Sequence, residues 1–269
     1  SIRPGKLFSG AEQRLAIYIL RPEADNSSDA FTTKYMKWAT EERSSLFERL
    51  CFQRADIKST IVWTKVPGAE AASVFQKMRG QDDVVAKHAK GSHLLYYKNT
   101  GINYYVTTTL RPPECFINGK RTPSSRETTI TFESEAALRF FHGLFSSSLF
   151  FVWYQGHSNC RDLNPSDLTT VPFPSSILKD KGFTHLSTKL QASLIENSWF
   201  QIRTQEQTGE VRIQSFSPGR SKPILDEIDA LLAAHYGLSE EELDFVINYD
   251  IKYRMGDELD PTSRNASSG

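Results

Sequence analysis

Residues 144–174 constrain the fold more than any other stretch of this sequence. They begin with an apolar run at 149–154, which is too short to cross a membrane, and then change abruptly to a polar loop at 156–162. Asn164 and Pro165 follow as a turn and helix start. Residues 171–174, Val-Pro-Phe-Pro, are expected to be extended, because a residue before proline is pushed out of the helical region. An aromatic segment that leads into a rigidly bounded polar loop can hold polar side chains out towards a binding partner. The plainer alternative is a core element followed by an ordinary surface loop.

The rest of the chain predicts a mixed α/β fold of the α+β class. Strands are expected at 14–20, 93–97, 103–110 and 127–132, with a hairpin turn at 99–101. Residues 200–217 are charged and partly β-like. Helices are expected at 67–79, at 134–146 with Ser134 as its cap, within 176–198 and at 222–234. Their expected apolar faces include Ala71, Val74, Phe75 and Met78 in the first, and Leu186, Leu190, Leu194 and Ile195 in the third. A further helix begins at Ser239, because Ser239 and Glu242 form a capping-box pattern.

Composition bounds the class of protein. The 269 residues suffice for one large or two modest domains. Lysine and arginine number 32, as do aspartate and glutamate, so the net charge of zero counts mildly against nucleic acid, although a local basic patch can be offset elsewhere. Cys51, Cys115 and Cys160 form no zinc pattern, and a reduced, cytoplasmic compartment is expected. The chain starts without methionine and in mid-pattern, so we expect a fragment of a longer protein.

Several uncommon motifs occur in a fixed order along the chain. The central stretch carries Ser147-Ser148-Leu149-Phe150, then Asn159-Cys160-Arg161-Asp162-Leu163-Asn164, then Val171-Pro172-Phe173-Pro174; earlier stand Arg3, Pro4, Lys6, Leu7, Phe8, Gly10, Ala11, Glu12, Gln13 and Arg14, then Thr33, Tyr35, Trp38, Glu41, Glu42, Arg43, Leu46 and Phe47. With the tail at 228–256, this pattern resembles the C-terminal target-recognition (specificity) region of adenine-specific DNA methyltransferases of restriction-modification systems, type IIG-like and TaqI-like. The resemblance covers residues 1 to about 256.

The resemblance implies a division of the chain. Residues 1–30 would be the C-terminal edge of a methyltransferase catalytic domain, a remnant of its sheet. Residues 31–220 would form a β-rich target recognition domain with packed helices, 221–256 a helical C-terminal tail and 257–269 a flexible terminus. In the family, such a region grips double-stranded DNA and selects the sequence, in phage defence. An upstream methyltransferase domain or subunit transfers methyl from S-adenosylmethionine to adenine.

Catalytic motifs of such an enzyme are missing here. There is no glycine-rich turn for S-adenosylmethionine, and the single Pro-Pro pair, Pro112-Pro113, stands between Arg111 and Glu114 and lacks the Asn/Asp-Pro-Pro-aromatic pattern. His157, Cys160 and Asp162 are close in sequence, but catalytic triads assemble from distant segments. We therefore predict no catalytic residue, no cofactor site and no metal site in this chain, and no methylation by the chain alone.

Two loop regions carry the residue types that contact DNA. Phosphates are contacted by lysine, arginine and small polar groups, and base edges by arginine, lysine, asparagine, glutamine or serine. The candidate DNA-binding residues are Lys98, Arg111, Lys120, Arg121, Ser124, Ser125, Arg126, His157, Ser158, Asn159 and Arg161. Each single cation is more often a solvated surface charge, so the hypothesis concerns the loops as a set facing one side. A local ion pair of Arg161 with Asp162 is an additional interpretation.

Other readings stay open at this point. Tyr96, Tyr97, Tyr104 and Tyr105 are interpreted as strand packing and not as base-stacking platforms. The main alternative function is a protein-interaction or scaffold module that docks through its aromatic surface and acidic tail, without DNA binding. A separately encoded specificity subunit is a third possibility.

Overall fold

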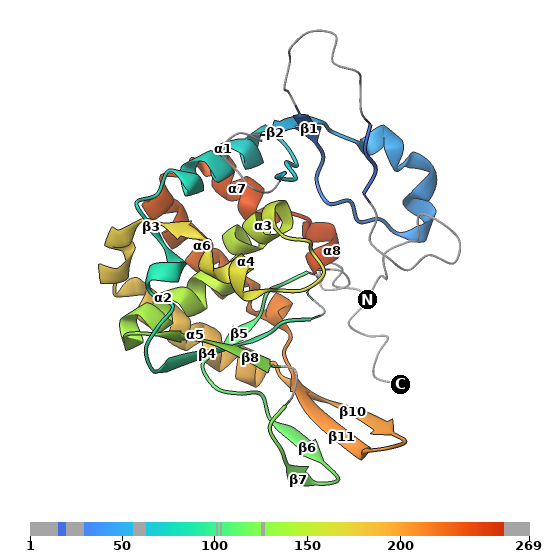
Figure 1. The fold of residues 1–269 in the computed structure, drawn as a ribbon, viewed down its shortest axis with the longest axis vertical. Helices are drawn as coiled ribbons and strands as arrows, with labels where there is room; N and C mark the ends of the chain where they lie inside the picture. The colour runs from blue at the N-terminus through green and yellow to red at the C-terminus, as the bar shows by residue number, and fades with distance from the viewer. Residues whose placement is uncertain are drawn as a thin grey trace.

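The computed structural model describes residues 16–19, 30–55, 63–100, 102, 104–124 and 127–255 of the chain. Its fold is mixed α+β, as predicted. A helical body forms the centre; a lobe of residues 30–55 lies at one end of it, and an arm of β-strands projects from the other end (Figure 1).

The core is built around two consecutive helices, α2 (Glu135–Ser146) and α3 (Ser148–His157), which meet at an angle of 66°. Ser134 caps α2, as predicted, by accepting a hydrogen bond from the Ala137 amide. Residues 148–156 of α3 are all buried, so this helix has no polar face. The buried carboxylate of Asp229 accepts hydrogen bonds from the amides of Ser148 and Leu149, at 3.0 and 2.9 Å, which satisfies the first turn of α3.

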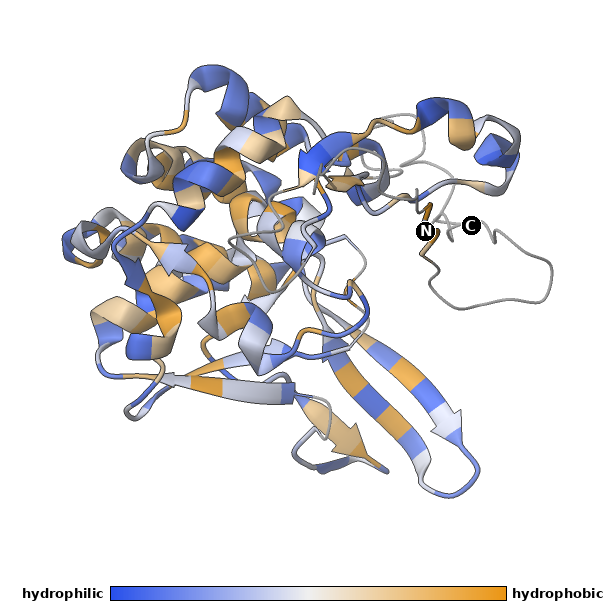
Figure 2. Ribbon diagram, turned by 45° about the horizontal axis from the view of Figure 1, so that its top comes forward, coloured by the Kyte–Doolittle hydropathy of each residue, from blue (hydrophilic) through white to orange (hydrophobic). Residues whose placement is uncertain are grey.

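Other helices surround this pair. They are α1 (Ala69–Arg79), α4 (Pro165–Thr169), α5 (Gly182–Glu196), α6 (Lys222–Tyr236), α7 (Glu240–Asn248) and α8 (Ile251–Met255). The predicted face of α1, Ala71, Val74, Phe75 and Met78, is buried, and the predicted Ser239–Glu242 capping box is present. In α5, by contrast, Ile195 was expected on the apolar face but is exposed. Figure 2 shows the apolar residues concentrated in the helices at the centre of the body.

A three-stranded antiparallel sheet packs beside α2. Its order is β5 (Thr108–Thr109), β4 (His93–Lys98) and β8 (Glu127–Phe132), so the predicted strands at 93–97 and 127–132 are confirmed. The chain turns back after β4, because the next strand, β5, pairs with β4 antiparallel, but this pairing begins only at Thr108, so the connection is longer than the predicted turn at 99–101. The Asn99 carbonyl accepts a hydrogen bond from the Leu163 amide at 2.8 Å, and Thr100 forms a bridge to Asp162. The described backbone at Asn99 and Thr100 is therefore bonded to the loop after α3.

The arm is a four-stranded antiparallel sheet of order β10 (Trp199–Gln205), β11 (Gly209–Ser215), β6 (Cys115–Ile117) and β7 (Lys120–Arg121). Two strands of seven residues, β10 and β11, form a ribbon with residues 206–208 as its turn. The Asn118 side chain holds this turn: its amide donates to the Thr208 carbonyl at 3.0 Å, and its oxygen accepts from the Glu210 amide at 2.9 Å. The arm is thus closed at its tip by side-chain bonds.

Short elements complete the chain. The pair β3 (Asp83–Val84) and β9 (Pro172–Phe173) confirms the extended backbone expected at 171–174. Short 3₁₀ helices occur at η3 (Val85–Lys87), η4 (Ser175–Lys179) and η5 (Pro218–Ser221). The lobe contains β1 (Ala30–Thr32), β2 (Gln53–Ala55), η1 (Thr40–Ser45) and η2 (Phe47–Arg49).

Two predictions concern the ends of the chain. Residues 16–19 form no strand, and Ile17 and Ile19 are exposed, so the strand expected at 14–20 is wrong in that part. The remainder of residues 1–30 up to Asp29, and residues 257–269, lie outside the described residues.

No single helix in the described part of the chain is long and apolar enough to span a membrane. The bent pair α2–α3 meets that test of length and composition when both are taken together, and both belong to the core described above.

Candidate functional site

A groove of about 390 Å³ lies between the sheet of the body and the ribbon of the arm. The body side contributes Tyr96, Lys98, Tyr104, Tyr105 and Thr107, and the arm contributes Gln201, Arg203, Gln205, Ser215 and neighbouring residues. Body and arm come from segments about a hundred positions apart in the sequence. The groove is therefore a product of the tertiary fold.

Strand register decides which arm residues face the groove. Successive side chains of a strand point to opposite faces, and directly paired residues share a face. Gln201, Arg203 and Gln205 consequently lie in one row, opposite Ile213, Val211 and Gly209. Gln201 and Arg203 form no side-chain hydrogen bond or ion pair within the described residues, and the Gln205 oxygen accepts one from the Thr208 hydroxyl at 2.6 Å.

The other face of the arm carries aromatic rings and a cation. Arg212 lies over Phe116 and Phe200, with its guanidinium carbon 5.7 and 5.0 Å from the ring centroids.

The strand register of the arm places two predicted site residues, Lys120 and Arg121, on opposite faces. Lys120 pairs with Ile117 and so lies on the same face of the arm as Arg203, whereas Arg121 pairs with Phe116 and lies on the opposite face. Arg121 is ion-paired with Glu114 at 3.3 Å.

The loop after α3 is held against the end of β4. Its Asp162 forms the bridge to Thr100 noted above, two residues beyond Lys98. The Asn159 side-chain oxygen accepts hydrogen bonds from the amides of Arg161 and Asp162, at 2.8 and 3.2 Å. The Arg161 side chain is 80% exposed, and its Nε lies 3.7 Å from Asp162, which confirms the local ion pair. Lys98, Asn159 and Arg161 are thus brought into one region of the surface.

Remaining members of the predicted set lie elsewhere. Arg111 is exposed just beyond β5, and Ser124 lines the groove. Ser125 and Arg126 fall outside the described residues.

His157 is a correction, because it is only half-buried at the surface and both of its ring nitrogens are engaged within the protein. It is the last residue of α3 and stacks on Trp153, with ring centroids 3.7 Å apart. Its two nitrogens lie 3.0 Å from the Trp153 carbonyl oxygen and 3.1 Å from an Arg79 nitrogen. Burial lowers the pKa of His157 to about 3, so the ring is neutral at pH 7 and supplies no charge for a phosphate.

Ser158 is also a correction. Its side chain is buried, and its hydroxyl oxygen accepts a hydrogen bond from the Cys160 amide at 2.9 Å. Its carbonyl accepts one from the Lys65 ammonium at 2.7 Å, and Lys65 also donates to the Gly156 carbonyl at 3.3 Å. Burial lowers the pKa of Lys65. Ser158 and Lys65 therefore close the C-terminal end of α3 and do not face a partner.

The charge of the groove is mixed. Lys98 and Arg203 supply positive groups, and Glu127, which is paired with Lys98 in register, supplies a carboxylate. One Glu127 carboxylate oxygen is buried without a hydrogen-bond partner among the described residues. The groove thus offers tyrosines, amides, two cations and one acidic acceptor.

The tyrosines have structural contacts. Tyr97 is 2% exposed and belongs to the core, so its interpretation as packing is confirmed. Arg254 lies over Tyr105, with its guanidinium carbon 4.4 Å from the ring centroid, and the Lys37 ammonium lies 5.0 Å from the Tyr104 ring. Tyr104 and Tyr105 thereby attach the groove wall to the body.

Pro112 and Pro113 lie in the connection from β5 to β6, and no aromatic residue follows them directly. No three histidine, cysteine, aspartate or glutamate side chains gather as a metal-ion site in the part of the chain that the structure describes.

Sequence reasoning missed Gln201, Arg203 and Gln205, the row of β10 side chains that lines the groove. Residues 199–205 and 209–215 alternate around a Glu-Gln-Thr turn, which is a ribbon signal. Which face of that ribbon meets the body depends on its pairing with β6, far away in sequence, and local pattern does not contain this information.

Comparison of the chain with protein-family models, with curated proteins and with solved structures finds no match.

Proposed function

We propose that this chain is the DNA-recognition part of an adenine-specific DNA methyltransferase of a restriction-modification system. It binds double-stranded DNA in the cytoplasm and works with a methyltransferase domain or subunit that holds S-adenosylmethionine. The chain itself contributes recognition and no methyl transfer. The sequence motifs support the family, and the groove supports the role.

The observation that carries the proposal is the row Gln201, Arg203 and Gln205 on β10, which faces the groove and in which Gln201 and Arg203 have no side-chain partner among the described residues. Amide and guanidinium groups are the groups that bind base edges. Exposed cations lie on either side of it: Lys98 at the end of β4, Lys120 on the same face of the arm, and Arg161 in the loop after α3. Such cations contact phosphates and position a protein on the duplex.

Salt dependence of binding tests the proposal. We expect the full chain to bind a labelled mixed-sequence duplex in fluorescence anisotropy, with an affinity that falls steeply as salt rises from 50 to 200 mM. Each phosphate contact adds about 0.9 to the slope of log affinity against log salt. Changing Lys98, Lys120 and Arg161 together to glutamine should lower that slope by roughly 2 to 3.

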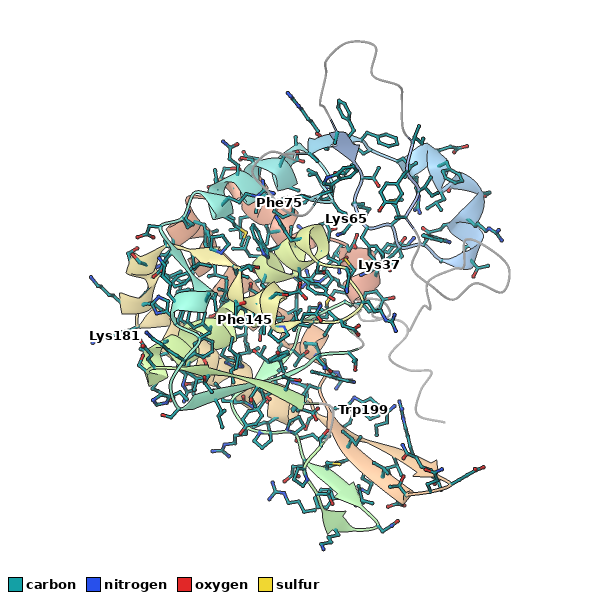
Figure 3. The ribbon with its side chains drawn as sticks, viewed as in Figure 1. Lys37, Lys65, Phe75, Phe145, Lys181 and Trp199 are labelled. Carbon is teal, nitrogen blue, oxygen red and sulfur yellow. The ribbon has the colours of Figure 1, made fainter. Side chains whose placement is uncertain are left out.

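The matched control is Lys181→Gln. Lys181 lies on the opposite side of the molecule from Trp199, at the base of the arm (Figure 3). This variant should keep the slope of the unmodified chain. Absence of duplex binding, or binding that ignores salt, would contradict the proposal.

A protein-interaction module without DNA binding is the second candidate, and one observation favours it. Phe31, Phe52 and Trp63, in or just beyond the lobe, are each more than half exposed, and Trp63 contacts Tyr18 edge-on with ring centroids 6.5 Å apart. Exposed apolar clusters mark interaction surfaces. Under this alternative, Phe52→Ser abolishes association with a protein partner or a second copy, and the groove variants change nothing.

A further inference from the structure

We propose that β10 is a base-reading strand: Arg203 and Gln205, with Gln201 behind them, contact base edges in the major groove of duplex DNA. This inference rests on the proposed DNA binding and adds the residues that determine sequence preference. The side chains named here were not among the residues that sequence motifs indicated.

The β10 edge of the four-stranded arm is the part that enters the major groove. Neighbouring strands lie about 4.8 Å apart and the groove is about 12 Å wide, so it takes β10 and β11 and not all four strands. β10 is the outer strand of the arm, so one of its edges has no partner strand among the described residues. Arg203, Thr204 and Gln205, next to the ribbon turn, are exposed, whereas Gln201 is half-buried nearer the body.

Spacing along β10 matches the spacing of base pairs. Side chains two residues apart on one face of a strand are separated by about 6.7 Å. Base pairs rise by about 3.4 Å, so Arg203 and Gln205 address positions two base pairs apart when the strand follows the groove. Gln201 is one further step of the same length away.

The chemistry of the row favours purines. Arginine donates two hydrogen bonds to the O6 and N7 atoms of guanine, and glutamine pairs with the N6 and N7 atoms of adenine. Arg203 therefore specifies guanine, and Gln205 specifies adenine two base pairs from it. The neutral bond from Thr208 to Gln205 is exposed, and a base replaces it at little cost.

Other arginines of the arm are engaged, which leaves Arg203 for the ligand. Arg212 lies between two phenylalanine rings, and Arg121 is ion-paired with Glu114. The backbone beneath Arg203 is rigid, because β11 pairs with all of β10 and Asn118 fixes the turn. A side chain on a rigid strand reads position more sharply than one on a loop.

Selection from a pool of random duplexes tests this inference with the full chain. The unmodified chain should enrich a motif with a guanine and an adenine two base pairs apart. Arg203→Ala should reduce the guanine preference by roughly 5- to 150-fold and leave the adenine preference intact. Gln205→Ala should do the reverse. Arg203→Lys should lose most of the guanine preference while retaining the salt slope, because lysine keeps the charge and loses the planar fork.

Two variants serve as controls, and circular dichroism checks folding. Thr204→Ala changes the opposite face of the same strand, and Lys181→Ala changes an exposed charge far from the arm. Both should select the unmodified motif. If the chain binds duplex DNA but Arg203→Ala and Gln205→Ala select that motif too, this inference is wrong and the proposed function stands. If the chain binds no duplex, both are wrong.

Discussion

Gly156 marks a tight contact between two helices of the body. It lies in the last turn of α3, where a Cβ atom would be 2.5 Å from the Phe75 ring of α1. Phe75 is 1% exposed, and it contacts the His157 and Trp153 rings at centroid distances of 4.8 and 6.0 Å. The Phe75 ring thus has no free space into which it can turn.

We expect Gly156→Ala to destabilise the protein by about 1–3 kcal/mol, because the added methyl group overpacks the contact between α1 and α3. The urea unfolding midpoint measures the effect. Gly80→Ala is the matched control, since a Cβ there meets its nearest atoms at 3.5 Å, an ordinary contact, with φ of −75°. Equal midpoints for Gly156→Ala and the unmodified chain would show that the body tolerates the methyl group.

Single residues were predictable from the sequence where the determining pattern is local. The buried face of α1 and the caps at Ser134 and Ser239 follow from neighbours within a few positions. His157 was not predictable, because its neutral, stacked state depends on Arg79 and Phe75 as well as on its own helix.

At the scale of elements, one carboxylate connects the lobe to α8, the last helix that the structure describes. Glu42 of η1 accepts hydrogen bonds from the Lys252 ammonium, the Tyr253 hydroxyl and the Ala39 amide, at 2.8, 2.8 and 2.7 Å. These bonds, led by that of Lys252, lower the pKa of Glu42 from 4.5 to about 2. The contact therefore joins η1 to α8 across more than two hundred positions.

Acid should weaken this connection. The pKa of Glu42 is lower in the folded state, so its stabilisation is present above pH 4.5 and is lost as the pH falls towards 2. We expect Glu42→Gln to lower the free energy of unfolding at pH 7 by on the order of 1–2 kcal/mol, after allowance for solvent screening. The difference from the unmodified chain should shrink between pH 5 and pH 2 in urea titrations.

Glu48→Gln provides the comparison, because Glu48 is an exposed carboxylate of the neighbouring η2. It should change the free energy of unfolding little at either pH. A Glu42→Gln deficit that stayed constant from pH 7 to pH 2 would argue against a role for the ionised carboxylate.

The sequence predicted whether a segment is a helix or a strand more often than it predicted which segments pair or pack together. Most helices, β4 and β8 were expected from periodicity, and residues 200–217 were expected to be partly β-like. The antiparallel return after β4 was predicted, but its pairing begins at Thr108 and not directly after 99–101. The backbone of Asn99 and Thr100 is bonded to residues 162 and 163, a tertiary contact that the local turn pattern does not contain.

For the whole molecule, α6 and α7 pack into the same core as α2 and α3, since Ile228, Leu232 and Val246 are fully buried in it. The groove, the loop after α3 and the arm are positioned by this body. Candidate DNA contacts were partly predictable: Lys98, Asn159 and Arg161 come together, whereas the row on β10 emerges only from long-range pairing.

Hydrogen–deuterium exchange of the full chain, with and without saturating duplex DNA, tests most directly the claim that this side of the molecule binds DNA. We expect the amides of residues 159–163 and 203–210 to exchange more slowly in the complex, and those of α5 to be unaffected. Unchanged exchange in both regions at saturation, or protection confined to the lobe at 30–55, would contradict the account.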